Sequence, residues 1–211
     1  MVNNDYTTAE HALAYLANAD KIPHRTEGEG VLLSFIPPTS GRILDLGTGD
    51  GRLLALLLLR CKTADCIGID SSPTMIDAAN ERFRGNQQVR ILQHDLEQTL
   101  PDLGSFDAIV SSFAIHHCAN DRKRALYAEV FDRLTPGGVF CNLEHVSSPT
   151  ASLRERFLQS LTITAEDEDN GNILLDVETQ LKWLRENGFQ DVDCSWKWLE
   201  LCLFGGRRRK T

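Results

Sequence analysis

The chain has 211 residues, of which 42% are hydrophobic, and a formal net charge of -8 at pH 7. This size and composition predict a single globular domain, residues 1–211, that buries a core without disulfide support. Because an acidic body repels polyanions, the charge disfavours nucleic acid as a partner, and the basic residues 207–210 are interpreted as a solvated end.

The cysteines are widely spaced and form no C-x-x-C pair, which is typical of reduced core thiols. The sequence shows no basic-then-apolar leader and no apolar run of about 18 residues, so we expect neither export nor a membrane span. A cytoplasmic location is the corresponding expectation. The six cysteines are Cys61, Cys66, Cys118, Cys141, Cys194 and Cys202.

Residues 1–40 are interpreted as an N-terminal helical cap segment. Within it, Thr7-Thr8-Ala9-Glu10 has the spacing of a capping box and predicts a helix from about Thr8 to Asn18. Residues 21–30 are rich in polar and turn-forming side chains, and the apolar run 31–36 follows them.

The run Ile43-Leu44-Asp45-Leu46-Gly47-Thr48-Gly49-Asp50-Gly51 predicts a strand that enters a tight turn, and the leucine-rich residues 52–59 predict the helix after it. Glycines at 47, 49 and 51 allow the chain to turn without a Cβ clash and leave main chain bare for a ligand. Such a turn is typical of a nucleotide site.

The identity of the nucleotide depends on two acids. The third glycine comes one residue too early for a dinucleotide motif, and Asp45 would place negative charge beside a pyrophosphate, so a cationic ligand suits the turn better. Asp70 ends the next apolar run, Cys66 to Ile69, where its carboxylate can accept both ribose hydroxyls of an adenosine. An adenosine with a cationic tail is S-adenosylmethionine.

From about residue 20 onward the chain resembles the class I S-adenosylmethionine-dependent methyltransferases. The resemblance rests on four motifs in family order: DLGTGDG at 45–51, GIDSSPTMI at 68–76, FDAIVSSFAIHH at 106–117 and RLTPGGVF at 133–140. It implies a three-layer α/β Rossmann-like sandwich with a seven-stranded, mostly parallel sheet whose last strand is antiparallel. S-adenosylmethionine would lie across the carboxyl ends of the first three strands.

Further cofactor contacts follow from this resemblance. Met75 follows a helix start capped by Ser71 or Ser72 and is either a ribose or adenine contact or a core residue. After a third strand, 89–94, Asp95 would accept from the adenine amino group and Leu96 would flank the ring, unless Asp95 only caps its loop. The expected contacts are Arg25, Asp45, Gly47, Thr48, Gly49, Gly51, Asp70, Ser71, Met75, Asp95, Leu96 and Ser112.

Arg25 has two interpretations. Segments before the first strand close over cofactor and substrate in the resembling family, so its guanidinium could bind the carboxylate of the methionyl group or of the substrate. Alternatively, it is an exposed side chain paired with Glu27 or Glu29.

The fourth strand, 106–112, is followed by Ser112-Phe113-Ala114-Ile115, where relatives that methylate base or glutamine amino groups carry an Asn-Pro-Pro-Tyr-like sequence. This difference favours a small-molecule acceptor with oxygen, nitrogen or carbon as the reacting atom. Adjacent His116 and His117 point in different directions, so one of them faces the site. His117 is the candidate general base, and packing or cofactor shaping is the alternative.

A fifth strand, 139–143, ends in Glu144 and His145. Glu144 could orient a donor or accept a proton and His145 could act as a base, whereas both could equally support a hydrogen-bonded loop. No ligand spacing indicates a metal site.

The rest of the chain predicts an amphipathic helix, 121–134, and a lid insertion, 146–187, with helices at 151–161 and 177–186 around an acidic loop. A hairpin of strands 189–198 and 199–205 closes the sheet. Trp196 and Trp198 share one face of the hairpin, which we expect to pack against a helix.

The sequence therefore predicts methyl transfer from S-adenosylmethionine to a small-molecule acceptor that it does not identify. A methyltransferase acting on protein or tRNA, and a cofactor-binding module without catalysis, are the alternatives. Transfer to an aligned acceptor needs positioning and water exclusion more than a strong base. The sequence does not predict an oligomeric state.

Overall fold

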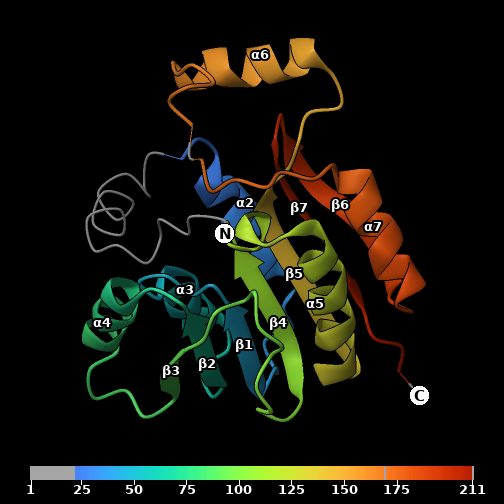
Figure 1. The fold of residues 1–211 in the computed structure, drawn as a ribbon. Coiled ribbons are helices and arrows are strands. Elements are labelled where there is room, and N and C mark those ends of the chain that lie inside the picture. The colour runs from blue at the N-terminus through green and yellow to red at the C-terminus, as the bar shows by residue number, and fades with distance from the viewer. Residues whose placement is uncertain (1–21, 169, 211) are drawn as a thin grey trace.

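The computed structural model describes residues 22–168 and 170–210, so the helix expected at 8–18 lies outside the described residues (Figure 1). One seven-stranded sheet runs through the molecule in the order β3-β2-β1-β4-β5-β7-β6. Its strands are β1 (Arg42–Leu46), β2 (Asp65–Asp70), β3 (Val89–Gln93), β4 (Phe106–Ser112), β5 (Leu134–His145), β6 (Gln190–Trp198) and β7 (Leu201–Arg207).

The strand directions confirm the predicted fold class. β1 to β5 pair in parallel, and β7 lies antiparallel to both of its neighbours, β5 and β6. The chain reverses strand order at β1, with β2 on one side of it and β4 on the other. Ligands of open parallel sheets bind at the carboxyl ends of the strands beside such a reversal, which places the expected site at the tips of β1, β2 and β4.

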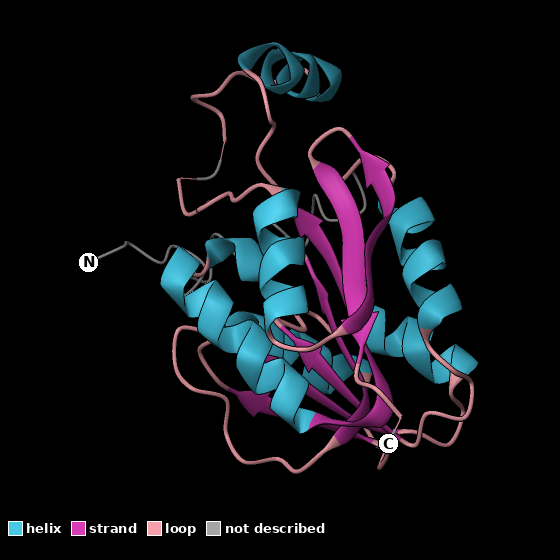
Figure 2. Ribbon diagram, turned by 90° about the vertical axis from the view of Figure 1, so that its right-hand side faces the viewer, coloured by secondary structure: helices cyan, strands magenta, loops and turns pink. Residues whose placement is uncertain are grey.

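Helices cover both faces of the sheet and form the outer two layers (Figure 2). On one face, buried leucines of α2 and α3 belong to a single apolar cluster, and side chains of α5 and α7 belong to the cluster on the other face. The helices are α2 (Arg25–Phe35), α3 (Arg52–Arg60), α4 (Pro73–Arg82), η3 (Ile115–His117), α5 (Asn120–Arg133), α6 (Ala151–Leu161) and α7 (Val177–Glu186).

Helix α2 corrects the prediction that residues 21–30 form a turn-rich connection. Its glycines weaken the helical signal in the sequence, yet Gly28 is needed because a Cβ there would lie 2.7 Å from the Leu143 side chain. The close approach lets α2 pack on β5 and on Trp196 of β6. Tertiary packing therefore determines this helix, and it confirms that Trp196 packs against a helix.

Half of the basic end is docked, which corrects part of another expectation: Arg207 and Arg208 contact the body of the protein, whereas Arg209 and Lys210 are exposed. The Arg208 guanidinium lies 5.1 Å from the centre of the Phe131 ring and donates to carbonyl oxygens of Phe131, Asp132 and Leu134 at the end of α5. A cation there satisfies the last carbonyls of a helix. Arg207 donates similarly to Phe35 at the end of α2.

Helix α6 stands beyond the carboxyl ends of the strands, apart from the two helical layers (Figure 1). Its Phe157 is buried, and its ring lies 6.1 Å from the ring of Trp198 and 5.2 Å from that of His145. Among the described residues, no helix combines the length and apolar composition required to cross a bilayer.

Candidate cofactor and acceptor site

The turn after β1 brings bare main chain to the end of the sheet. Gly47 has a φ of 70°, and a Cβ at this position would overlap the Cβ of Ala114, so the turn can approach the end of β4 only with glycine here. Gly49, with a φ of 56°, has no neighbouring atom within 4 Å of the position that a Cβ would take. A ligand can therefore lie directly on the peptide units of this turn.

Asp70 holds the turn from the tip of β2. One carboxylate oxygen accepts the N–H of Gly49 at 2.9 Å, and the other accepts the N–H of Ser72 at 2.9 Å. Burial raises the pKa of Asp70, and its hydrogen bonds to main-chain N–H groups oppose that shift. The same carboxylate still faces the cavity described next, where it can accept further hydrogen bonds.

A cavity lies at the carboxyl ends of the strands. Its empty space, including the part that is open to solvent, is about 900 Å³. We call it the strand-end cavity. All the expected cofactor contacts line it except Gly51, whose missing Cβ makes room instead for Phe83. Other lining residues, which the sequence did not predict as cofactor contacts, are Asp50, Arg52, Leu53, Ser72, Glu97, Phe113, Ala114 and Cys118.

Two polar atoms in this lining have no partner among the described residues, namely Asp45 Oδ1 and Ser112 Oγ. Asp45 is 1% exposed, its Oδ2 accepts the Thr48 hydroxyl at 2.7 Å, and burial raises its pKa to about 7. A buried carboxyl with an unpaired oxygen is costly unless a ligand meets it. The lining therefore fits a ligand with a positive charge near Asp45 and a sugar near Asp70.

Arg25 enters the cavity from the first turn of α2. It is 7% exposed, its Nε donates to Glu29 at 3.0 Å, and its guanidinium lies 5.7 Å from the centre of the Phe113 ring. Arg52 donates to the same Glu29 carboxylate at 2.9 and 3.1 Å. Two guanidinium groups in the lining of the cavity thus share one carboxylate.

Asp95 and Ser72 each make the local hydrogen bond that the sequence offered as an interpretation. Asp95 lines the cavity after β3, and its Oδ1 also accepts the N–H of Glu97 at 2.9 Å, so it caps its loop while facing the ligand space. Ser72 is the residue that caps α4, accepting from the N–H of Met75. Met75 is 4% exposed and lines the cavity while being part of the buried side of its helix.

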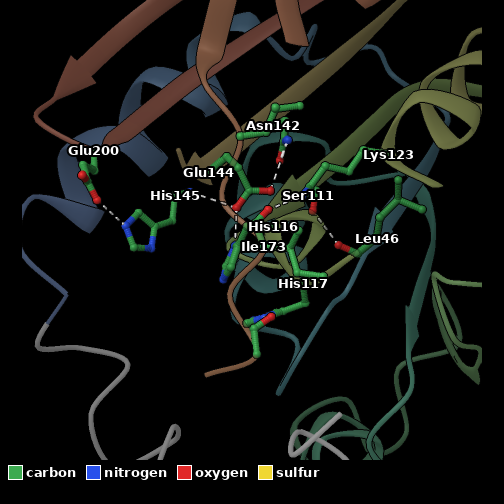
Figure 3. A network of polar contacts seen from close by, with 12 residues as sticks. Leu46, Ser111, His116, His117, Lys123, Asn142, Glu144, His145, Ile173 and Glu200 are labelled. Carbon is green, nitrogen blue, oxygen red and sulfur yellow. Dashed lines mark hydrogen bonds and ion pairs between the residues drawn. The ribbon is translucent and has the colours of Figure 1, made fainter. Parts of the chain in front are cut away.

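The two adjacent histidines have different surroundings, although their rings lie against each other (Figure 3). His117 lines the strand-end cavity, and its Nδ1 lies 3.2 Å from the carbonyl oxygen of Gly171. His116 is 6% exposed and turns inward, with its Nδ1 2.5 Å from Glu144 Oε1. The centres of the two rings are 3.9 Å apart.

Glu144 does not line the strand-end cavity, which disfavours its role as an acceptor-facing group and favours its alternative as a hydrogen-bonded support. It is 1% exposed, lies outside the cavity lining, and accepts from the His145 N–H at 2.9 Å and from Asn142 at 3.4 Å. Burial raises its pKa to about 7, and the nearby charges of His117 and Lys123 oppose the shift. Glu144 is therefore a buried partner of His116 that acts on His117 only through electrostatics.

His145 also lies outside the cavity lining. Its Nε2 is 3.0 Å from Glu200 Oε2, and Arg154 of α6 donates to the same oxygen at 2.6 Å. Glu168 joins this group. One potential metal-ligand atom from each of His145, Glu168 and Glu200 lies within 4.8 Å of the other two. Arg154 pairs with both acids and offsets part of their charge, and the long sequence separations conceal the cluster from spacing arguments.

Comparison with known proteins agrees with this geometry. A family model described as a methyltransferase domain matches residues 43–138. Residues 43–138 of the chain are thus similar to the methyltransferase-domain family, and curated relatives that are methyltransferases match about half of the chain. S-adenosylmethionine is the cofactor of this family, and the unpaired oxygen of Asp45 and the position of Asp70 fit it.

Relatives of the chain act on different acceptors. It is 37% identical over 110 residues to a demethylmenaquinone methyltransferase of Thermus thermophilus, which covers 51% of the chain and 49% of the relative. It is 33% identical over 124 residues to a malonyl-[acyl-carrier protein] O-methyltransferase of a Marinomonas species, covering 57% and 45%. The chain thus spans about half the length of these relatives.

A solved structure shows the same fold. Human N-acetylserotonin methyltransferase in complex with S-adenosylmethionine superposes with a TM-score of 0.71 at 17% identity, over 98% of this chain and 58% of the human chain. At this identity the likeness supports the arrangement of strands and helices and leaves the acceptor undetermined.

Proposed function

We propose that this protein transfers the methyl group of S-adenosylmethionine to a small-molecule acceptor whose reacting atom lies beside His117. The observation that carries the proposal is that Asp70, Asp45 and His117 line one cavity. A single cavity at the end of the sheet would therefore offer a carboxylate to the ribose, a carboxyl group to the cationic centre, and a base to the acceptor.

The cofactor-binding roles follow from the lining. Asp70 would accept from the ribose hydroxyls, and the main chain at Gly49 would leave room for the methionyl arm. Asp45 Oδ1 would accept from the cationic end, and Arg25 would bind a carboxylate, with Glu29 holding its guanidinium in place. Asp95 and Leu96 would contact the adenine.

When bound, the cofactor supplies an activated methyl group together with its leaving group, so the protein must chiefly align the acceptor and exclude water. Phe113 and Ala114 provide the apolar wall beside the turn. For a hydroxyl acceptor, His117 would take the proton, and the nearby Glu144 carboxylate would stabilise the imidazolium that forms. For a carboxylate acceptor, positioning by Arg25 would be sufficient.

His117 is preferred to His145 as the base because only His117 of the two lines the strand-end cavity. One ring nitrogen of His145, Nε2, is 3.0 Å from Glu200 Oε2. We therefore propose that His145 supports the loop beside α6, which is the alternative that the sequence left open for it.

The direct test is turnover. The purified protein would be incubated with S-adenosylmethionine and a panel of small phenols, carboxylic acids and amines, and release of S-adenosylhomocysteine would be measured. We expect release with at least one acceptor class and its loss in Asp70→Ala, with Asp77→Ala, an exposed acid on α4, as the matched control. Cofactor binding without turnover on any acceptor would support the non-catalytic module instead.

A further inference from the structure

Two cysteines lie on adjacent strands of the hairpin that closes the sheet, as diagonal neighbours in the ladder, and neither lines the strand-end cavity. Cys194 of β6 is opposite Phe204 in the ladder, and Cys202 of β7 is opposite Lys197. The register shifts between Cys194 and Trp196, which places an extra residue in β6. Both cysteines pack against the same apolar cluster, so their side chains are on the same face of the sheet.

The chemical environments of these two thiols differ. Cys194 is partly exposed, and its interaction with the Cys202 thiol together with the Lys197 ammonium lowers its pKa to about 7. Asp193 opposes that shift, and Cys194 Sγ lies 3.4 Å from the Trp196 carbonyl oxygen. Cys202 is buried, and both burial and the Cys194 thiol raise its pKa, so it remains protonated.

The other cysteines have different surroundings. Burial raises the pKa of Cys66, Cys118 and Cys141 to about 12. Burial also raises the pKa of Cys61. All four are buried. A partly exposed thiol with a second thiol beside it is therefore found, among the described residues, on the β6–β7 hairpin.

We propose that Cys194 and Cys202 form a reversible disulfide when the protein meets a hydroperoxide. The Cys194 thiolate attacks the outer peroxide oxygen, which breaks the O–O bond, gives a sulfenic acid on Cys194 and releases an alcohol or water after protonation. The Cys202 thiol then attacks the Cys194 sulfur, the S–S bond forms, and the hydroxyl leaves as water with the Cys202 proton. The two thiols are oxidised by two electrons, and the peroxide is reduced by two.

The disulfide would act on the turn that holds α6. Residues 194–202 include Trp198 and Glu200, and Glu200 is the residue that binds His145 of β5 and Arg154 of α6. A covalent link across the base of this turn restricts the conformations from which Glu200 can release Arg154. The modification site therefore couples the redox state of the hairpin to the anchorage of α6.

The test uses the purified full chain, reduced and freed of reductant, then treated with a small excess of hydrogen peroxide. Free thiols would be blocked with iodoacetamide in denaturant, and the intact mass and the peptides would be measured. We expect two thiols of the wild type to escape alkylation, a cross-linked peptide that joins residues 194 and 202, and full reversal by dithiothreitol. Cys61→Ser, a buried cysteine outside the hairpin, should behave like the wild type.

The single variants separate the two chemical steps. Cys194→Ser should lose the disulfide, whereas Cys202→Ser should retain a Cys194 sulfenic acid that dimedone labels about tenfold more than any other cysteine. Circular dichroism would show that both variants fold. A wild type that keeps all its thiols, or a cross-link that joins a different pair, would overturn the proposal. Equal dimedone labelling of all cysteines in Cys202→Ser would overturn it as well.

Discussion

Asp45 and Asp70 are buried carboxyls of one cavity, and their hydrogen bonds give them different tasks. Asp70 accepts two main-chain N–H groups and so is fixed in direction at the tip of β2. Asp45 keeps one oxygen without a partner among the described residues. The first arrangement suits neutral hydroxyl donors, and the second suits a cation that can supply the missing charge.

Asp70→Ala should weaken S-adenosylmethionine binding by roughly 30-fold or more, because a charged acceptor of hydrogen bonds contributes about 2 kcal/mol or more when it is desolvated. Isothermal titration calorimetry on the variant measures this directly. Asp77→Ala on the exposed side of α4 should bind like the wild type. A melting temperature of Asp70→Ala close to that of the wild type would show that the turn remains folded. An unchanged affinity would contradict the role of Asp70.

His117→Asn should lower turnover of a hydroxyl acceptor by about 100-fold, the usual contribution of a general base, while cofactor affinity changes little. End-point assays of S-adenosylhomocysteine release measure turnover, and calorimetry measures cofactor affinity, so the two effects are separated. His145→Asn is the matched comparison, because His145 lies outside the cavity lining. A larger loss of turnover in His145→Asn than in His117→Asn would assign the base to His145.

Glu144→Gln should leave kcat/KM nearly unchanged below about pH 6, where burial already keeps Glu144 protonated, and should lower it above about pH 7. At the higher pH the ionised carboxylate of the wild type stabilises the positive charge that forms on His117 when it takes a proton. Lys123 faces the same carboxylate. Glu155→Gln on the exposed side of α6 should leave the profile unchanged. A profile of Glu144→Gln that only falls in height would indicate a structural role alone.

At the scale of elements, the sequence predicted most of the sheet because its strands carry local signals. β4, α6 and α7 have the predicted bounds, since their apolar patterns end at clear caps or turns. Helix α2 and the docked half of the basic end were missed, because both depend on partners distant in sequence. Gly28 lets α2 pack closely on Leu143 of β5, because a Cβ at this position would lie 2.7 Å from the leucine side chain. Arg208 donates to carbonyl oxygens at the end of α5.

Strand pairing between β5 and β7 depends on a missing side chain. A Cβ at Gly205 would overlap the Phe140 carbonyl oxygen and lie 3.0 Å from its carbon, and this backbone cannot move without breaking the ladder. Gly205→Ala should therefore lower the free energy of unfolding by about 2 kcal/mol or more. Gly30→Ala in α2, where nothing lies within 4 Å, should raise it by up to about 1 kcal/mol. Urea denaturation of both variants tests the contrast.

At the scale of the molecule, the sequence located the cavity but not all of its walls. The turn at 47–49 and the acids at strand ends are local motifs whose place follows from parallel topology. Phe113, Glu97 and Arg52 line the cavity because of how η3, the loop after β3 and α3 fold over it. Glu144 and His145 end β5, next to β4, yet they bind His116 and Glu200 outside the cavity lining, which no residue pattern reveals.

The pH dependence of stability follows from buried acids whose pKa values are raised by desolvation, which are Asp45, Glu144 and, in the same direction, Asp70. Asp45 and Glu144 titrate near 7 in the folded state and near 4 when unfolded. Between these values the unfolded chain loses protons that the folded protein keeps. The stabilisation is complete below about pH 4 and is lost as the pH rises through 7.

The melting temperature without ligand should therefore fall from pH 5.5 to pH 8. The double variant Asp45→Asn, Glu144→Gln should flatten this dependence, and S-adenosylmethionine should raise the melting temperature more at pH 8 than at pH 5.5, because ionised Asp45 binds its charge. A wild-type melting temperature that rises over this range would refute the assignment.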